Sequence, residues 1–209
     1  MRILQGIAAA VALGLAGTAQ ATLITYTFSG VVNSSNVSGT ATTFSGSFAY
    51  DTEGPMYSSS LSSPAKWYHA AKSISFSSGD VSVTALAHSP NSYVYVENGQ
   101  YVDNFSVFVF ENDIAGGFND VEVLLEDWAS RSSINSTDIP ISLNPNTFNE
   151  KYFKAYKANG QSIQGRITTL SAVSAVPELQ TWILLISGFG GIGTVMRRSR
   201  IRSSMCTAL

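Results

Sequence analysis

The chain has 209 residues, of which 12% are charged, and its formal net charge is −2 at pH 7. Between residues 22 and 176, thirteen acidic residues outnumber seven basic ones, and this acidic balance excludes the clustered positive charge that nucleic-acid binding requires. The single cysteine is Cys206, near the C-terminus, so no internal disulfide can form and the fold must be held by its core.

The first 21 residues have the pattern of a secretory signal peptide. A positively charged start precedes an apolar core over residues 3–16, and Ala19 and Ala21 form a small-x-small cleavage site. We expect the Sec machinery to export the chain and signal peptidase to cut it after Ala21. An uncleaved N-terminal anchor is the alternative.

Residues 22–175 fit a single exported domain of β-strands. Apolar and polar side chains alternate over residues 24–28 and 44–50, which is the period-two pattern of a half-buried strand. Short strands joined by Ser-, Gly- and Asn-rich connections, such as residues 33–42 and 51–64, predict an all-β fold, an antiparallel β-sandwich of jelly-roll-like type. Further strands are expected at residues 73–76, 81–87, 105–110, 121–126 and 162–170.

A β-hairpin is expected around Asn98 and Gly99, which separate two apolar runs at residues 93–96 and 100–102. The Asn-Gly pair favours a type I′ turn because both residues tolerate positive φ.

Residues 147–156 leave two structures open. Thr147 and Glu150 fit a capping box that would start a short helix. The alternation of Tyr152, Lys154 and Tyr156 permits a strand equally well.

Five aromatic side chains are candidates for a platform that stacks against sugar rings: Trp67, Tyr68, Tyr93, Tyr95 and Tyr101. The alternative is that they are ordinary core residues or cross-strand pairs, which is the commoner role of aromatic residues in strands.

Oxygen-bearing side chains gather at expected strand ends, at residues 103–104, 111–113 and 119–120. Calcium binds several such oxygens, but the spacing of an EF-hand loop is absent and Asn and Asp are common turn formers. We expect no cofactor, and calcium binding stays open as an alternative.

No catalytic motif stands out. The two histidines, His69 and His88, lack the spacing of zinc ligands, and the Gly-x-Ser-x-Gly elbow, the P-loop and the dinucleotide fingerprint are all absent from the sequence. We therefore expect a protein that is not an enzyme. A secreted hydrolase, the less favoured alternative, would need a pocket that joins one of these histidines to a carboxylate.

Residues 176–202 combine a short polar motif, an apolar run and a basic cluster. Four arginines follow the apolar run and no basic residue occurs in the ten positions before it, so the positive-inside rule predicts a cytoplasmic C-terminus. We expect a transmembrane helix over residues 182–196 and a cytoplasmic tail over residues 203–209. This run is shorter than the roughly 20 apolar residues of a full span, which suits a segment that is held briefly and removed. A plain membrane anchor is the alternative.

This tail resembles the PEP-CTERM sorting signal, which membrane-bound exosortases recognise on exported bacterial proteins. Leu179 stands where the family has its second proline. The same tail is also classed as a C-terminal domain of ice-binding proteins, but the body lacks an array of Thr-x-Thr repeats. The residues that carry the resemblance are Pro177, Glu178, Thr181, Trp182, Gly188, Phe189, Gly190, Gly191, Gly193, Arg197, Arg198 and Arg200.

The resemblance implies a Gram-negative bacterium that makes exopolysaccharide, and processing by an exosortase near Pro177 and Glu178. We therefore expect a protein that is anchored in the inner membrane before processing and is then displayed at the cell surface or released. Its expected role is that of a non-catalytic surface or matrix protein of the exopolysaccharide or biofilm, with exopolysaccharide as a partner. The alternative function is a carbohydrate-binding module, which requires Trp67 or the hairpin tyrosines to face solvent in one plane.

Overall fold

The computed structural model describes residues 22–59, 64–87, 91–110, 114 and 116–173. The signal peptide with Ala19 and Ala21, and the whole sorting signal with its transmembrane helix, lie outside the described residues. Within the described part, no helix is present that is long and apolar enough to span a membrane.

Eleven strands form one hydrogen-bonded sheet in which every pair of neighbours is antiparallel. The prediction of an all-β antiparallel domain is confirmed. The order across the sheet is β3-β4-β7-β8-β9-β10-β11-β1-β2-β5-β6. The strands are β1 (Leu23–Ser35), β2 (Thr43–Asp51), β3 (Met56–Ser59), β4 (Ala65–Tyr68), β5 (Ala71–Ser78), β6 (Val81–Leu86), β7 (Ser92–Asn98), β8 (Asp103–Phe110), β9 (Asp120–Asp127), β10 (Glu150–Tyr156) and β11 (Ser162–Val173).

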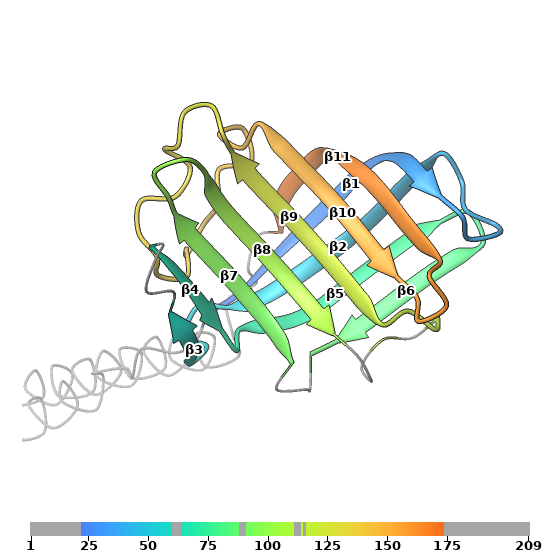
Figure 1. Cartoon of the computed structure of the whole chain (residues 1–209), viewed down its shortest axis with the longest axis horizontal. Coiled ribbons are helices and arrows are strands. Elements are labelled where there is room, and N and C mark those ends of the chain that lie inside the picture. The colour runs from blue at the N-terminus through green and yellow to red at the C-terminus, as the bar shows by residue number, and fades with distance from the viewer. Residues whose placement is uncertain (1–21, 60–63, 88–90, 111–113, 115, 174–209) are drawn as a thin grey trace, which may run out of the picture. The chain divides into compact units, whose positions relative to one another are not determined.

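The sheet curls so that its two halves face each other across the core. In Figure 1 strands β4 and β7 to β10 make up a front layer, and β1, β2, β5 and β6 lie behind it. Strand β5 contacts β7 and β8 of the opposite layer, and a bridge between Ala85 of β6 and Ile114 ties the edge of the rear layer to the segment that follows β8. The sandwich-like layering therefore comes from the bending of one continuous sheet.

Aromatic rings fill the space between the layers. Phe28, Phe44 and Phe153 lie with ring centroids 5.7–6.0 Å apart, and Phe76 stacks on Phe153 at 4.1 Å. Such bulk fits because facing positions carry glycine: a Cβ atom on Gly165 would lie 2.2 Å from the ring of Phe44. Because a glycine, which has no side chain, faces a large aromatic ring, the ring can lie directly against the backbone of the facing strand.

A long connection between β9 and β10, residues 128–149, closes one end of the core. Three tyrosines of the sheet bind it through their hydroxyl groups: Tyr50 donates to the carbonyl of Pro140 at 3.0 Å, Tyr68 donates to that of Thr137 at 2.9 Å, and the Tyr26 hydroxyl accepts from the amide of Leu143 at 2.6 Å. Because buried polar groups must be paired, these contacts fix the irregular segment against the apolar core.

Asp127 starts this connection and holds its first turn. Its carboxylate accepts hydrogen bonds from the amides of Ala129, Ser130 and Ser132 and from the hydroxyls of Ser130 and Ser133. Burial alone would raise the pKa of the Asp127 carboxyl, but these hydrogen bonds outweigh it and hold the pKa well below its usual range. Arg131, within this turn, has a positive φ of 52°.

The local structure differs from the sequence-based expectation in three places. A hairpin is present around Asn98 and Gly99, but its second strand is β8 from Asp103 onward, and residues 100–102, predicted as that strand, lie in the turn. The type I′ turn at Asn98 and Gly99 is also wrong, because Asn98 still pairs with Asp103 and the amide of Gly99 donates to the carbonyl of Val102. Neither Asn98 nor Gly99 has positive φ. Residues 150–156 form the strand β10 and not a helix. Part of the connection expected at residues 51–64 is strand β3, which pairs with β4.

Candidate functional site

The outer surface of the front layer carries an unusual number of aromatic side chains. In β7, Val94 and Val96 are fully buried and point into the core, so Tyr93 and Tyr95 between them point outward. The same alternation in β8 turns Phe108 outward. Tyr93, Tyr95 and Phe108 are all partly exposed.

These side chains pack against each other on the sheet. The ring of Trp67 lies 4.5 Å from Tyr95, 5.6 Å from Phe108 and 5.9 Å from Tyr93. Phe108 and Phe110 are stacked at 5.7 Å. We call this group the aromatic face, defined by Tyr57, Trp67, Tyr93, Tyr95, Phe108 and Phe110.

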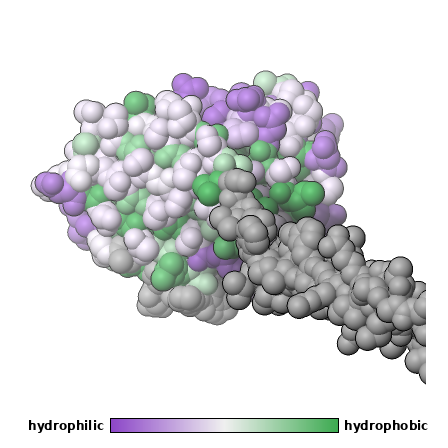
Figure 2. All heavy atoms as spheres, turned by 180° about the vertical axis from the view of Figure 1, so that it is seen from behind, coloured by the Kyte–Doolittle hydropathy of each residue, from purple (hydrophilic) through white to green (hydrophobic). Residues whose placement is uncertain are grey.

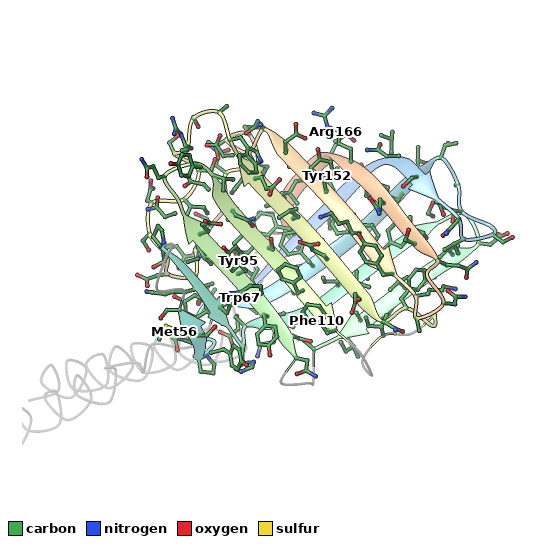
Figure 3. The ribbon with its side chains drawn as sticks, viewed as in Figure 1. Met56, Trp67, Tyr95, Phe110, Tyr152 and Arg166 are labelled. Atoms are coloured by element: carbon green, nitrogen blue, oxygen red, sulfur yellow. The ribbon has the colours of Figure 1, made fainter. Side chains whose placement is uncertain are left out.

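One row of paired residues extends the aromatic face across the sheet. Trp67 pairs with Tyr95, Tyr95 with Ser106, Ser106 with Leu124, Leu124 with Tyr152, and Tyr152 with Arg166. Figure 3 shows Trp67, Tyr95, Tyr152 and Arg166 in this order across the front layer. Neighbouring strands lie about 4.8 Å apart, so the path from Trp67 to Tyr152 is about 19 Å long. Ser106 and Leu124 in the middle of the row are only 0% and 8% exposed, so a ligand along this path would contact mainly Trp67, Tyr95 and Tyr152.

A parallel row of carboxylates lies two residues away along the same strands. Glu97 pairs with Asn104, Asn104 with Glu126, and Glu126 with Glu150. The Tyr95 hydroxyl donates to Glu97 at 2.8 Å, and the Tyr152 hydroxyl donates to Glu150 at 2.6 Å. We call Glu97, Glu126 and Glu150 the carboxylate row.

The hydrogen bonds between the two rows affect the tyrosines. Burial raises the pKa of Tyr95, and the hydrogen bond to Glu97 raises it further. The hydrogen bond to Glu150 is the main cause of the raised pKa of Tyr152. Both hydroxyls therefore stay protonated in the neutral range and hold their rings beside the carboxylates.

A third row of paired residues, formed by Lys154, Glu122 and Phe108, contains an ion pair. Lys154 lies 3.5 Å from Glu122, which is largely buried under its neighbours on the outer surface. Burial raises the pKa of Glu122, and the positive charge of Lys154 partly offsets this.

Only three of the five aromatic side chains predicted as a platform lie together, and their rings do not share one plane, since the planes of Trp67 and Tyr93 are 88° apart and those of Trp67 and Tyr95 are 46° apart. Trp67, Tyr93 and Tyr95 come together on the aromatic face, with neighbouring rings in contact. Tyr68 does not belong to it, because it points inward and is 8% exposed. Tyr101 lies in the connection between β7 and β8, where it is 74% exposed and has no ring contact with the described aromatic face.

Sequence reasoning missed Tyr57, Phe108, Phe110 and Tyr152 as members of this surface. The signal for Phe108 and Phe110 was available, because they alternate with Val107 and Val109 and only one of the two sets can face the core. The position of Tyr57 could not be inferred, because β3 was expected to be a loop.

His69 lies at the edge of the aromatic face. Its ring is 4.9 Å from Tyr57 and 5.0 Å from Tyr93. Its Nδ1 atom is buried without a hydrogen-bond partner, and in the described part of the chain no ion pair joins His69 to a carboxylate. His88 lies outside the described residues.

The acidic positions considered for calcium do not converge. Asp103 is fully buried, and its Oδ2 atom accepts from the amide of Ile134, whereas Asp120 lies at the opposite end of the paired strands β8 and β9. Residues 111–113 are not described. Among the described residues, no group of three or more metal-binding side chains is present.

The outer surface of the rear layer is chemically different. Hydroxyl side chains follow each other across β11, β1, β2, β5 and β6, and some bond to each other, as in Ser29 with Thr169 at 2.6 Å and Ser47 with Ser75 at 2.8 Å. Figure 2 shows this side of the molecule largely in the pale colours of intermediate hydropathy. Two paired rows make up this hydroxyl face: Ser171, Thr27, Ser47, Ser75 and Thr84, and Thr169, Ser29, Ser45, Ser77 and Ser82.

The hydroxyl face also contains two shallow hollows of about 500 and 520 Å³, lined mostly by Ser, Thr and Gly. They carry no charged side chain, and several of their hydroxyls already pair with each other. The chemically richer surface is therefore the aromatic face.

Comparison with known proteins gives no relative from which a role for these surfaces could be inferred. No protein-family model matches the chain, and no curated protein matches it significantly.

Proposed function

We propose that this protein is an exported, non-catalytic surface or matrix protein that binds polysaccharide through the aromatic face. The single observation that carries the proposal is the placement of Trp67, Tyr93 and Tyr95 on one outer surface of the sheet, partly exposed and with the ring of Trp67 against both tyrosines. A buried position for these rings would have removed the basis for sugar binding.

The chemistry of the aromatic face fits a carbohydrate ligand. Aromatic rings offer flat apolar surfaces at low cost in conformational entropy, and large exposed clusters of them mark binding surfaces in soluble proteins. The carboxylates beside them accept hydrogen bonds, which sugar hydroxyls can donate. A path of about 19 Å along the sheet accommodates several units of a polymer.

The handling of the chain is a separate part of the proposal. It rests on the signal peptide pattern of residues 1–21 and on the resemblance of residues 176–202 to a PEP-CTERM signal. On this basis the chain passes through the inner membrane, is held by a transmembrane helix, and is cut by an exosortase before it reaches the cell surface or the extracellular matrix. We also propose that the curled sheet is of the jelly-roll type.

A binding assay tests the proposed ligand class. We expect the purified protein to be retarded in native gels that contain exopolysaccharide from the native host. Trp67→Ala removes the ring at the centre of the contacts. It should reduce the affinity derived from the retardation at least tenfold. Thr27→Ala on the hydroxyl face is the matched control and should bind like the wild type. Equal binding by all three proteins, or no binding by the wild type, would contradict the proposal.

A further inference from the structure

We propose that the carboxylate row restricts the ligand to neutral or amino-substituted polysaccharides and excludes polymers of uronic acids. This inference rests on the proposed function, because it names the class of polysaccharide that the aromatic face accepts. The inference concerns the charge of the ligand and not its stacking on aromatic rings, so the charge selection and the polysaccharide binding can be tested separately.

The position of the carboxylate row relative to the aromatic face is fixed by strand register. Glu97, Glu126 and Glu150 occupy one paired row across β7, β8, β9 and β10, with Asn104 between the first two. Two residues along a strand correspond to about 7 Å, so the row runs beside the part of the path from Tyr95 to Tyr152. A polymer on that path would have carboxylates along one flank.

Hydrogen bonds keep these carboxylates in place. Glu97 accepts from Tyr95, two residues before it, Glu150 accepts from Tyr152, two residues after it, and Glu126 accepts from the indole nitrogen of Trp128 at 3.2 Å. A charged side chain that is held in this way cannot swing away from an incoming anion. Glu126 and Glu150 also have more acceptor sites than one donor uses, so they can still accept hydrogen bonds from hydroxyl or ammonium groups.

The charges of the described strands offset the carboxylate row only in part: Lys151 interacts electrostatically with Glu150 at one end of the row. Asp120 and Glu122 occupy outward positions of β9, and the only outward cations of the described strands β7 to β11 are Lys154 and Arg166. Lys154 is already paired with Glu122. Arg166 lies at the far end of the path, next to Tyr152. A polyanion would therefore meet repulsion over most of the path, whereas an amino group would be attracted.

Binding to three soluble polymers tests the inference: a neutral β-glucan, partly deacetylated chitin as the amino polymer, and polygalacturonate as the uronic acid polymer. At low salt we expect the wild type to bind polygalacturonate at least tenfold more weakly than the other two. The difference should shrink at about 1 M salt, where charges are screened within about 3 Å.

The combined variant Glu97→Gln, Glu126→Gln and Glu150→Gln removes the charge but keeps an acceptor oxygen at each position. It should gain about tenfold in affinity for polygalacturonate, lose affinity for the amino polymer and bind the β-glucan as before. The control Asp80→Asn removes one exposed charge at the turn between β5 and β6 and should change none of these affinities. A thermal melt of each variant verifies that the fold is intact.

The outcomes separate the two proposals. Binding of polygalacturonate as tightly as the β-glucan, with loss of both in Trp67→Ala, would overturn the charge selection and leave polysaccharide binding intact. An unchanged preference in the three-glutamine variant would also overturn it. If the wild type binds none of the three polymers and no host exopolysaccharide, or if it binds only a protein partner, the proposed function fails and the charge selection fails with it.

Discussion

The carboxylate of Asp127 should be one of the most sensitive single positions in the domain. It is fully buried and accepts five hydrogen bonds from residues 129–133 at the start of the long connection between β9 and β10. Asp127→Asn keeps one oxygen, which can still accept from the amides of Ala129 and Ser130. The new amide nitrogen cannot accept from the three groups that donate to Oδ2: the hydroxyls of Ser130 and Ser133 can turn to accept from it, but the amide of Ser132 loses its acceptor.

The expected loss follows from those three contacts. Hydrogen bonds to a charged group contribute about 1.5–3 kcal/mol each, they are not additive, and a buried donor left unpaired costs about 1–3 kcal/mol. We expect Asp127→Asn to lower the free energy of unfolding by about 3 kcal/mol, which corresponds to a fall in Tm of about 6–12 °C for a domain of this size. Asp138→Asn in the same connection is the control, because its partner Lys66 lies at an exposed site and such pairs contribute less than about 1 kcal/mol.

The pH dependence of this effect has a definite sign. The hydrogen bonds lower the pKa of Asp127 in the folded protein, so its contribution is complete above the pKa of the unfolded chain. That contribution is lost as the pH falls from about 4 toward the folded pKa. Denaturant unfolding at neutral and acidic pH measures it. A loss below 1 kcal/mol at neutral pH, or a difference from wild type that grows in acid, would refute the reasoning.

Three further substitutions test the core and the outer surface. Gly165→Ala should destabilise the fold by about 1–3 kcal/mol in chemical denaturation, because its Cβ would press on the ring of Phe44; a neutral result would mean that the ring is free to move. Tyr50→Phe should lose about 1 kcal/mol, since the carbonyl of Pro140 loses its donor, and faster hydrogen exchange in residues 138–143 should accompany it. Lys154→Met should raise the pKa of Glu122 further and destabilise the protein at neutral pH, with a smaller loss in acid where the carboxyl is protonated; a pH-independent loss would contradict this.

Much of the sheet could be predicted because its strands alternate strictly. Residues 44–50 expose serine on one side and aromatic rings on the other, and the structure has β2 there with Phe44, Phe48 and Tyr50 buried. Strand β3 could not be predicted, because its Ser-rich sequence has no alternation and it is formed through pairing with β4. The turn of the β7–β8 hairpin was mistaken because local Asn-Gly chemistry was overridden by continued pairing up to Asp103.

The candidate site was harder to predict because it depends on register. In β7 both sets of alternating side chains are apolar or aromatic, so the sequence does not say whether Tyr93 and Tyr95 or Val94 and Val96 face the core. The path to Tyr152 and the alignment of Glu97 with Glu150 arise from pairing between strands that are far apart in the chain. The hydroxyl face could not be predicted for the same reason, since each strand contributes only two of its residues.

The most direct test of polysaccharide binding is a comparison of Trp67→Ala with the wild type in binding to exopolysaccharide of the native host, at equal thermal stability. The aromatic face predicts at least a tenfold loss of affinity in Trp67→Ala and no change in Thr27→Ala. Wild-type affinity in Trp67→Ala would show that the aromatic face is only a packed layer on the sheet, and the proposed function would be contradicted.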